Sequence, residues 1–285
     1  MLSHAAVPVC YRIGGDVYRV FFSTRDAQQR SSTYSATFSL SKPQEVLEVG
    51  EQPVVGPGSP GSFDDAGAMA TAILKVGTDL LLYYIGWNRG VSVPFRNSIG
   101  LAVSRDGGTA FEKLHPGPIL DRSQFDPCFT ASCHVLEREG GYTMWYLSGL
   151  RWERDEIGNF KHFYHIKTAE SPDAKVWQRT GQVAIDFKDD SEHAISVPRV
   201  IKTGAGYSMW YSYRGDRYRI GYAESVDGLS WSRMDDLIEL APSIEDWDSE
   251  MICYPFVFEH GSDLFMLYNG NSYGKTGFGL ARLQR

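Results

Sequence analysis

The chain has 285 residues, a formal net charge of −7 and 42% hydrophobic residues, an ordinary composition for a globular protein. The negative charge balance and the lack of a basic run argue against nucleic-acid binding. No stretch approaches the roughly 20 apolar residues of a membrane span, and the first residues lack the basic and apolar segments of a secretory signal. We therefore expect a cytoplasmic protein with reduced thiols.

One aromatic-rich segment recurs five times along the chain. The copies occupy residues 17–26, 80–88, 142–149, 207–215 and 264–271. They follow one another at about 60 residues, and self-similarity at a nearly fixed period indicates a repeat architecture.

Each copy belongs to a larger unit with a constant internal order. An apolar stretch and a Gly- or Asp-containing turn precede four of the aromatic segments, and a third short strand follows all five. In three units a Ser-x-Asp turn and a fourth strand come next, and the turn is expected to be capped by its own side chains. Short β-branched and aromatic runs between turn residues are strand signals, and no segment shows a capped helical period. The sequence predicts an all-β fold: a single domain over residues 1–285, forming a five-bladed β-propeller of four-stranded antiparallel blades.

Acidic residues mark the start of the innermost strand in four of the five predicted blades. They are found in Phe63-Asp64-Asp65, Phe125-Asp126-Pro127, Asp190-Ser191-Glu192 and Asp248-Ser249-Glu250, whereas the first blade begins with Ser3-His4. Because innermost strands line the axis of a propeller, we expect these carboxylates to converge on one pocket. Mutual repulsion would then raise some of their pKa values, as acid catalysis requires. The alternative is that they bond to one another and to the inner-strand backbone.

A second set of polar and aromatic residues lies on the loops at the same rim. Aromatic rings offer flat apolar surfaces to sugar rings, while Arg, Asn and Lys donate to hydroxyl or anionic groups. This mixture suits a carbohydrate that carries a carboxylate or a phosphate. The candidate binding residues are His4, Arg25, Trp87, Asn88, His193, Arg199, Arg214, Asn269 and Lys275.

Metal and cofactor motifs are missing from the sequence. The four cysteines show no C-x-x-C spacing, and the histidines form no cluster with zinc-ligand spacing. There is neither a P-loop nor a dinucleotide fingerprint. We expect no metal and no cofactor.

With these acidic strand starts, the chain resembles the five-bladed β-propeller glycoside hydrolases, a superfamily that includes arabinanases, invertase-like enzymes and mannoside phosphorylases. The segment from Phe125 to Pro127 looks like the Asp-Pro element with which invertase-like enzymes bind sugar hydroxyls, and Glu192 stands where those families keep their acid/base Glu. The chain is more closely similar to uncharacterised bacterial glycosylase-like proteins. It departs from the classical pattern in two places: the first blade starts without a carboxylate, and the Pro that should follow Glu192 is displaced to Pro198.

The resemblance implies an enzyme that cleaves or transfers the glycosidic bond of a small or activated sugar through paired carboxylates. Glu192 would be the general acid and Asp65 the base or nucleophile, with Asp64 as the other candidate for that role. Asp126 and Glu250 would bind hydroxyls and tune pKa values. The substrate would be an oligosaccharide, a glycosyl phosphate or a nucleotide-linked sugar, used in making a surface polysaccharide.

Three alternatives remain open at this stage. In a phosphorylase, phosphate would replace water and be held by Arg25, Arg199, Arg214 and Lys275. A non-catalytic sugar-binding propeller would explain the missing first-blade carboxylate. A scaffold that binds protein on its flat face would bind no sugar at all.

Overall fold

The computed structural model describes residues 2–283, and these residues form an almost entirely β structure. The strands fall into five consecutive groups in which each strand pairs antiparallel with the next. Groups one and two contain β1 Ser3–Gly14, β2 Val17–Arg25, β3 Ser31–Ser39 and β4 Lys42–Val49, then β5 Gly67–Val76, β6 Asp79–Arg89, β7 Phe95–Ser104 and β8 Glu112–Lys113. Group three contains β9 Phe129–Arg138, β10 Gly141–Arg154, β11 Phe160–Ser171 and β12 Gln178–Ile185. Groups four and five contain β13 Ala194–Thr203, β14 Gly206–Arg214, β15 Tyr218–Ser225 and β16 Ser232–Arg233, then β17 Cys253–His260, β18 Asp263–Asn269 and β19 Phe278–Leu283.

Helical structure is confined to two short elements within the described residues. They are the 3-10 turn η1 Asp235–Leu237, after β16, and α1 Asn271–Gly274, between β18 and β19. Each of the first four groups has four strands, although β8 and β16 are only two residues long, and group five has three strands within residues 2–283.

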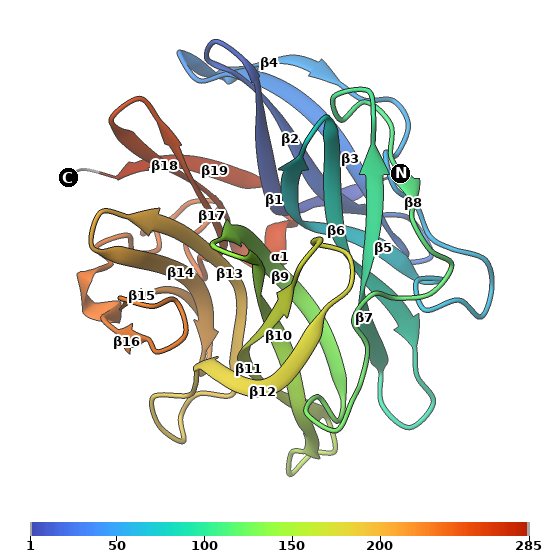
Figure 1. Ribbon diagram of the computed structural model, residues 1–285. Coiled ribbons are helices and arrows are strands. Elements are labelled where there is room, and N and C mark those ends of the chain that lie inside the picture. Colours follow the sequence, from blue (N-terminus) through green and yellow to red (C-terminus); the bar gives the residue numbers. More distant parts are fainter. Residues whose placement is uncertain (1, 284–285) are drawn as a thin grey trace.

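The five groups follow one another around a common centre, and the last group returns beside the first (Figure 1). The first strand of each group contacts the first strand of its neighbours in a ring: β1 with β5, β5 with β9, β9 with β13, β13 with β17, and β17 with β1. Backbone hydrogen bonds join the strands into three sheets: groups one and two form the first, groups three and four the second, and group five the third. None of these sheets is closed. Single parallel residue pairs, Ser31 with Gly67 and Tyr164 with Ala194, join groups one and two and groups three and four.

The predicted Ser-x-Asp turns are confirmed as capped turns that hold neighbouring groups together. In each, the serine hydroxyl donates to the aspartate, which accepts backbone N–H groups two to four residues further on. The turn after β15 then docks on the preceding group, where Trp145 Nε1 donates to the carbonyl oxygen of Gly228 at 2.9 Å. Tyr83 of β6 donates to the carbonyl oxygen of Ala174 in the same manner, at 2.6 Å. Buried aromatic rings between groups therefore carry hydrogen bonds as well as apolar contacts.

A fully buried asparagine connects the last group to the first. Asn269 ends β18; its Oδ1 accepts from the backbone N–H of Val7 and its Nδ2 donates to the carbonyl oxygens of Ala5 and Gly277, all at 2.8 Å. The sequence predicts that Asn269 binds substrate; instead its amide bonds to β1 and to Gly277, the residue before β19. Within residues 2–283 no strand of group one pairs with a strand of group five, so side-chain bonds such as these connect the two groups.

Removing this connection should weaken the whole ring. Asn269→Ala leaves a buried N–H and two carbonyl groups without partners, and we expect the free energy of unfolding to fall by about 3 kcal/mol. Urea denaturation measures the loss. The matched control is Asn159→Ala, because Asn159 lies in an exposed turn and its side chain bonds only to Asp155; its effect should stay within about 0.5 kcal/mol. Equal losses in the two variants would contradict the closing role of Asn269.

Candidate functional site

The predicted catalytic carboxylates do not meet in one pocket. Three of them, Asp64, Asp126 and Glu192, are buried within their own strand groups and bonded to basic side chains of the fourth strands. The prediction that they converge on the axis is therefore corrected. The physical reason is that groups two to four each supply their own hydrogen-bond donors to the carboxylate that precedes their first strand.

A tyrosine of the second strand binds a carboxylate 20 residues earlier in three of the groups. Tyr84 donates to Asp64 at 3.1 Å, Tyr146 to Asp126 at 3.1 Å, and Tyr268 to Asp248 at 2.9 Å. Burial, and then the neighbouring carboxylate, raise the pKa values of all three tyrosines. For Tyr268, burial and then the hydrogen bond to Asp248 both raise the pKa. The acidic residue that recurs before the first strands is thus the acceptor of a hydrogen bond from a tyrosine of the same group.

Asp126 has the most complete set of partners. Its carboxylate accepts from Ser148 at 2.6 Å, from Ser123 at 2.9 Å and from Tyr146, and it pairs with Arg179 at 2.8 Å. The side chain has no exposed surface. A carboxylate held in this way stabilises the fold and is not presented to a ligand.

Glu192 is bound by both ends of one guanidinium group. Arg233 donates to its two oxygens at 2.6 and 2.8 Å, and also bonds to Asp235 of η1 at 2.7 Å. Asp235 in turn accepts from Tyr211 at 2.5 Å, so it takes the place of the carboxylate found 20 residues earlier in the other groups. Burial lowers the pKa of Arg233, but its hydrogen bond to Glu192 and its charged neighbours outweigh this, so the net shift is upward.

The remaining two predicted carboxylates, Asp65 and Glu250, make no ion pair within residues 2–283. Asp65 accepts from Asn88 Nδ2 and from the backbone N–H of Gly61, each at 2.9 Å. Glu250 is exposed, and the bonds it makes through its backbone involve Asn271, Arg217 and Arg219.

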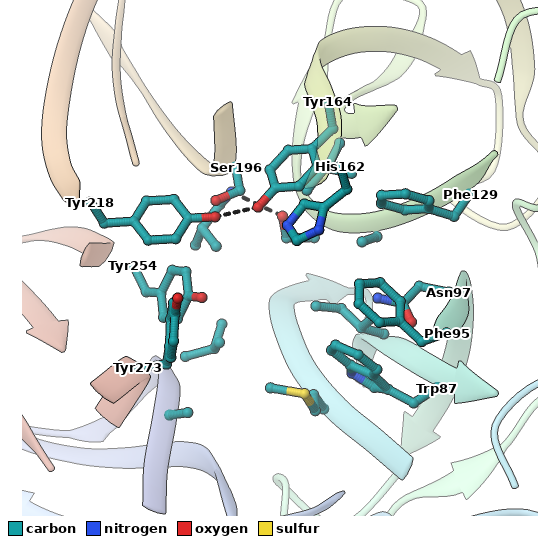
Figure 2. Close-up of a pocket in the computed structure, with 18 of the residues that line it drawn as sticks. Trp87, Phe95, Asn97, Phe129, His162, Tyr164, Ser196, Tyr218, Tyr254 and Tyr273 are labelled. Carbon is teal, nitrogen blue, oxygen red and sulfur yellow. Dashed lines mark hydrogen bonds between the residues drawn. The ribbon is translucent and has the colours of Figure 1, made fainter. Parts of the chain in front are cut away.

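The central cavity lies where the five groups meet and has a volume of about 270 Å³. Every group contributes to its lining, and no Asp or Glu among residues 2–283 does so. Two walls of different chemistry face each other across it (Figure 2). The rest of the lining is mainly small and aliphatic, for example Ala6, Met69, Ile85 and Leu147.

One wall is a cluster of aromatic rings. Phe95 of β7 packs against Trp87 of β6 with ring centroids 4.7 Å apart, and against Phe129 of β9 and His162 of β11 at 5.9 Å. Trp152 supports Phe95 from behind at 4.9 Å. This wall offers flat hydrocarbon surface to a bound molecule.

The opposite wall presents phenol groups. Tyr218 of β15, Tyr254 and Tyr273 form this wall (Figure 2). Tyr164 of β11 lies between the two walls, because it stacks on His162 at 5.1 Å and its hydroxyl is hydrogen-bonded to that of Tyr218. Burial raises the pKa of Tyr218 to about 12 and raises those of Tyr164 and Tyr254 well above their ordinary range. These phenols are therefore neutral at pH 7 and act as hydrogen-bond donors and acceptors.

Two arginines give the cavity its charge. Arg25, at the end of β2, and Arg214, at the end of β14, both line it, and neither forms an ion pair within residues 2–283. Arg214 donates to the Tyr273 hydroxyl at 3.2 Å and lies 5.5 Å from the centre of the Tyr218 ring. His162 adds no charge, because burial and then the nearby His193 and Arg214 lower its pKa to about 4.

Three lining residues carry a buried polar atom that has no hydrogen-bond partner within the described chain. These atoms are Trp87 Nε1, Asn97 Oδ1 and Ser196 Oγ. An unpaired buried polar atom costs about 1–3 kcal/mol, and five more such atoms lie away from this cavity within the described chain.

The cavity wall also contains strained backbone. Val7, Val197 and Tyr254 adopt positive φ angles of 51°, 49° and 58°, which a β-branched or bulky residue rarely does. Each sits at an irregularity of a first strand, and a side chain of a neighbouring group accepts its backbone N–H: Asn269, Ser132 and Ser212. Strain of this kind clusters at functional sites.

Of the predicted binding residues, Arg25, Trp87 and Arg214 line the central cavity and Asn88 lines an adjoining one. His193 lies behind the wall, with its ring nitrogens near the carbonyl oxygens of His162 and Gly215. The remaining candidates do not line either cavity: His4, Lys275 and Arg199.

Arg199 is a further correction, because it is a structural residue. Its Nε donates to the carbonyl oxygen of Val257 at 2.5 Å, its Nη1 contacts His134, and its guanidinium stacks 4.2 Å from the centre of the Phe256 ring. It thus connects the first strands of groups three, four and five below the cavity.

Sequence reasoning missed most of the phenol wall and the aromatic residues at the start of the third strands. Phe95, Asn97, His162, Tyr164 and Tyr218 all lie in the first residues of β7, β11 or β15. The available signal was the clustering of aromatic residues just after the loop that follows each second strand.

No cluster of three or more potential metal ligands occurs among residues 2–283, and no helix in that range is long and apolar enough to cross a membrane.

The fold is that of the propeller glycoside hydrolases. A thermostable family-43 glycoside hydrolase superposes with a TM-score of 0.75 over 100% of this chain and 91% of its own, at 18% identity. The sucrose-6-phosphate hydrolase from Lactobacillus gasseri gives a TM-score of 0.68 over 99% of this chain and 61% of its own, at 14% identity. At these identities the likeness establishes the fold alone.

The sequence relationship is more specific. The chain is 41% identical over 286 residues to the uncharacterized protein Rv1502 of Mycobacterium tuberculosis, covering 99% of this chain and 93% of the relative. The chain belongs to the same family as that mycobacterial protein. No protein-family profile matches it.

The buried carboxylate of Asp126 should govern stability. Asp126→Asn leaves Arg179 without its charge partner, and breaking such a pair on one side costs about 3–5 kcal/mol of unfolding free energy. Urea denaturation measures the change. Asp190→Asn is the matched control, since Asp190 is exposed and makes no side-chain bond within residues 2–283. A loss below about 1 kcal/mol for Asp126→Asn would contradict the structural role.

His162 should make the fold sensitive to acid. Its pKa is about 4 in the folded protein and near 6.5 when unfolded, so the unfolded state binds the proton first as pH falls. Its contribution is complete above pH 6.5 and is lost progressively as the pH falls toward 4. Between pH 7 and pH 4.5 the unfolding free energy of His162→Gln should fall about 2 kcal/mol less than that of the parent. Identical pH dependence in the two proteins would refute the assignment.

Proposed function

We propose that the protein binds an anionic carbohydrate in its central cavity, within a five-bladed propeller formed by residues 1–285 as one domain. The ring of contacts among β1, β5, β9, β13 and β17 supports the five-bladed interpretation. The observation that carries the function is the composition of the cavity: aromatic rings, phenols and two arginines without ion-pair partners, and no carboxylate among the described lining residues.

The two walls match the two kinds of surface on a sugar. Trp87, Phe95 and Phe129 provide rings on which the C–H bonds of a pyranose or furanose pack. Tyr218 and Tyr254 face them with hydroxyls that donate to and accept from sugar hydroxyls, and Tyr164, between the two walls, adds a third hydroxyl. Asn97 and Ser196, which also line the cavity, hold a buried acceptor and a buried hydroxyl that have no partner within residues 2–283.

The charge of the cavity selects among sugars. A partly buried guanidinium without a carboxylate partner is costly unless an anion completes it. Arg25 and Arg214 are in this situation, so a uronic acid or a sugar phosphate suits the cavity better than a neutral sugar.

Of the functions considered from the sequence, sugar binding without paired-carboxylate catalysis fits the geometry best. Asp64, Asp126 and Glu192 are held by Lys113, Arg179 and Arg233, at 2.5, 2.8 and 2.6 Å. Releasing any of them toward a substrate would break a buried ion pair, at a cost of several kcal/mol.

Glycosidic-bond cleavage is the second candidate, and one observation favours it. Asp65 makes no ion pair among the described residues and bonds to Asn88, which lines the cavity next to the central one. If the protein turns over a glycoside, Asp65→Asn should abolish turnover while leaving ligand affinity within about twofold of the parent. Fold likeness to glycoside hydrolases supports testing this activity, but chemistry resides in the site.

Arg214 should decide affinity for acidic sugars. Arg214→Gln removes a charge-assisted hydrogen bond worth about 1.5–3 kcal/mol, so binding of glucuronic or galacturonic acid should weaken about 10- to 100-fold. Isothermal titration calorimetry measures the affinities. Arg217→Gln is the control, because Arg217 is exposed, bonds only to the backbone of Glu250 and does not line the cavity. Equal binding of glucose and glucuronic acid to the parent protein would contradict the proposal.

A further inference from the structure

A second cavity, of about 200 Å³, opens beside the central one between groups one and two. It shares Arg25, Trp87 and Phe95 with the central cavity, so the two cavities adjoin each other. Its other walls come from the turn after β2 and from the end of β6, with Gln29, Asn88 and Arg89.

Two guanidinium groups line this outer cavity. Arg25 lies at its boundary with the central cavity, and Arg89 lies at its outer side, where its Nη2 donates to the carbonyl oxygen of Gln28. Neither arginine forms an ion pair in the described part of the chain, and no Asp or Glu from that part lines the cavity. Two acids that adjoin lining residues in the sequence are already engaged, Asp26 by Arg30 at 2.9 Å and Asp65 by Asn88.

The turn that presents these groups is rigidly constructed. Asp26 accepts the backbone N–H groups of Gln28 and Arg30 through its side chain, each at 2.9 Å, and Gln29 adopts a positive φ of 62° between them. The Arg89 contact with Gln28 ties the end of β6 to the same turn. The outer cavity is therefore formed before any ligand binds, which lowers the entropic cost of binding there.

We infer that the ligand is extended, with an acidic sugar in the central cavity and a second anionic group, joined to that sugar, in the outer cavity between Arg25 and Arg89. This inference rests on the proposed function of the central cavity. Trp87 lies at the junction of the two cavities, and its buried Nε1, which lacks a partner within residues 2–283, supplies a donor for the linking part of the ligand. The second anionic group is either the carboxylate of a further sugar or a phosphate on the first.

The test compares short and extended probes on three proteins. Galacturonic acid is paired with digalacturonic acid, and glucuronic acid with glucuronic acid 1-phosphate, and affinities are measured by calorimetry. The proteins are the parent, Arg89→Gln and Arg96→Gln. Arg96 is the matched control because it lies opposite Asn88 on β7, is exposed and lines neither cavity.

For the parent protein we expect at least one extended probe to bind about 10-fold or more tightly than its short partner, as one added charge-assisted contact provides. Arg89→Gln should remove this advantage and leave the affinity for the short probe unchanged, while Arg96→Gln should keep it. An advantage confined to digalacturonic acid identifies a second sugar as the outer group, and one confined to the 1-phosphate identifies a phosphate.

Equal affinities for short and extended probes would overturn the inference and leave the proposed function intact. The same loss in Arg96→Gln as in Arg89→Gln would overturn it too, since a general charge effect would then explain the difference. Failure of all four probes to bind would overturn both the inference and the proposed function.

Discussion

The bond between a strand-start carboxylate and a tyrosine of its own group determines much of this structure. In the second, third and fifth groups the pair spans 20 residues, and in the fourth Asp235 replaces the missing acid. The bond fixes the loop that leads into the first strand, and in the second to fourth groups a basic side chain of the fourth strand completes it. Because these acids are bonded within their own groups, none of them lines the central cavity. The charged residues that line it are Arg25 and Arg214.

The fold was largely predictable from the sequence, because the repeat of aromatic segments at about 60 residues sets the strand groups and their order. The capped Ser-x-Asp turns were predictable for the same local reason. Fourth strands vary from eight residues in β4 and β12 to two in β8 and β16, and group five has three strands within residues 2–283. The sequence also did not reveal that Asn269 completes the ring, since that bond joins residues 262 positions apart.

The site was predictable only in part. Arg25, Trp87 and Arg214 lie at or near the ends of second strands, and all three line the central cavity. The acids were misplaced because a repeat gives the position of a residue along the chain but not the direction of its side chain in the loop before a strand. Their partners Lys113, Arg179 and Arg233 come from fourth strands that lack a common sequence pattern. The phenol wall was missed because buried tyrosines normally indicate packing, and only the three-dimensional arrangement places their hydroxyls on a cavity.

A crystal structure of the protein with glucuronic or galacturonic acid tests the account most directly. The account predicts the sugar between Trp87 and the tyrosine wall, with its carboxylate bound by Arg214 or Arg25, while Asp126 and Glu192 still hold Arg179 and Arg233. A sugar contacted by Asp126 or Glu192, with those ion pairs broken, would contradict this prediction. It would instead support glycosidic-bond cleavage by paired carboxylates.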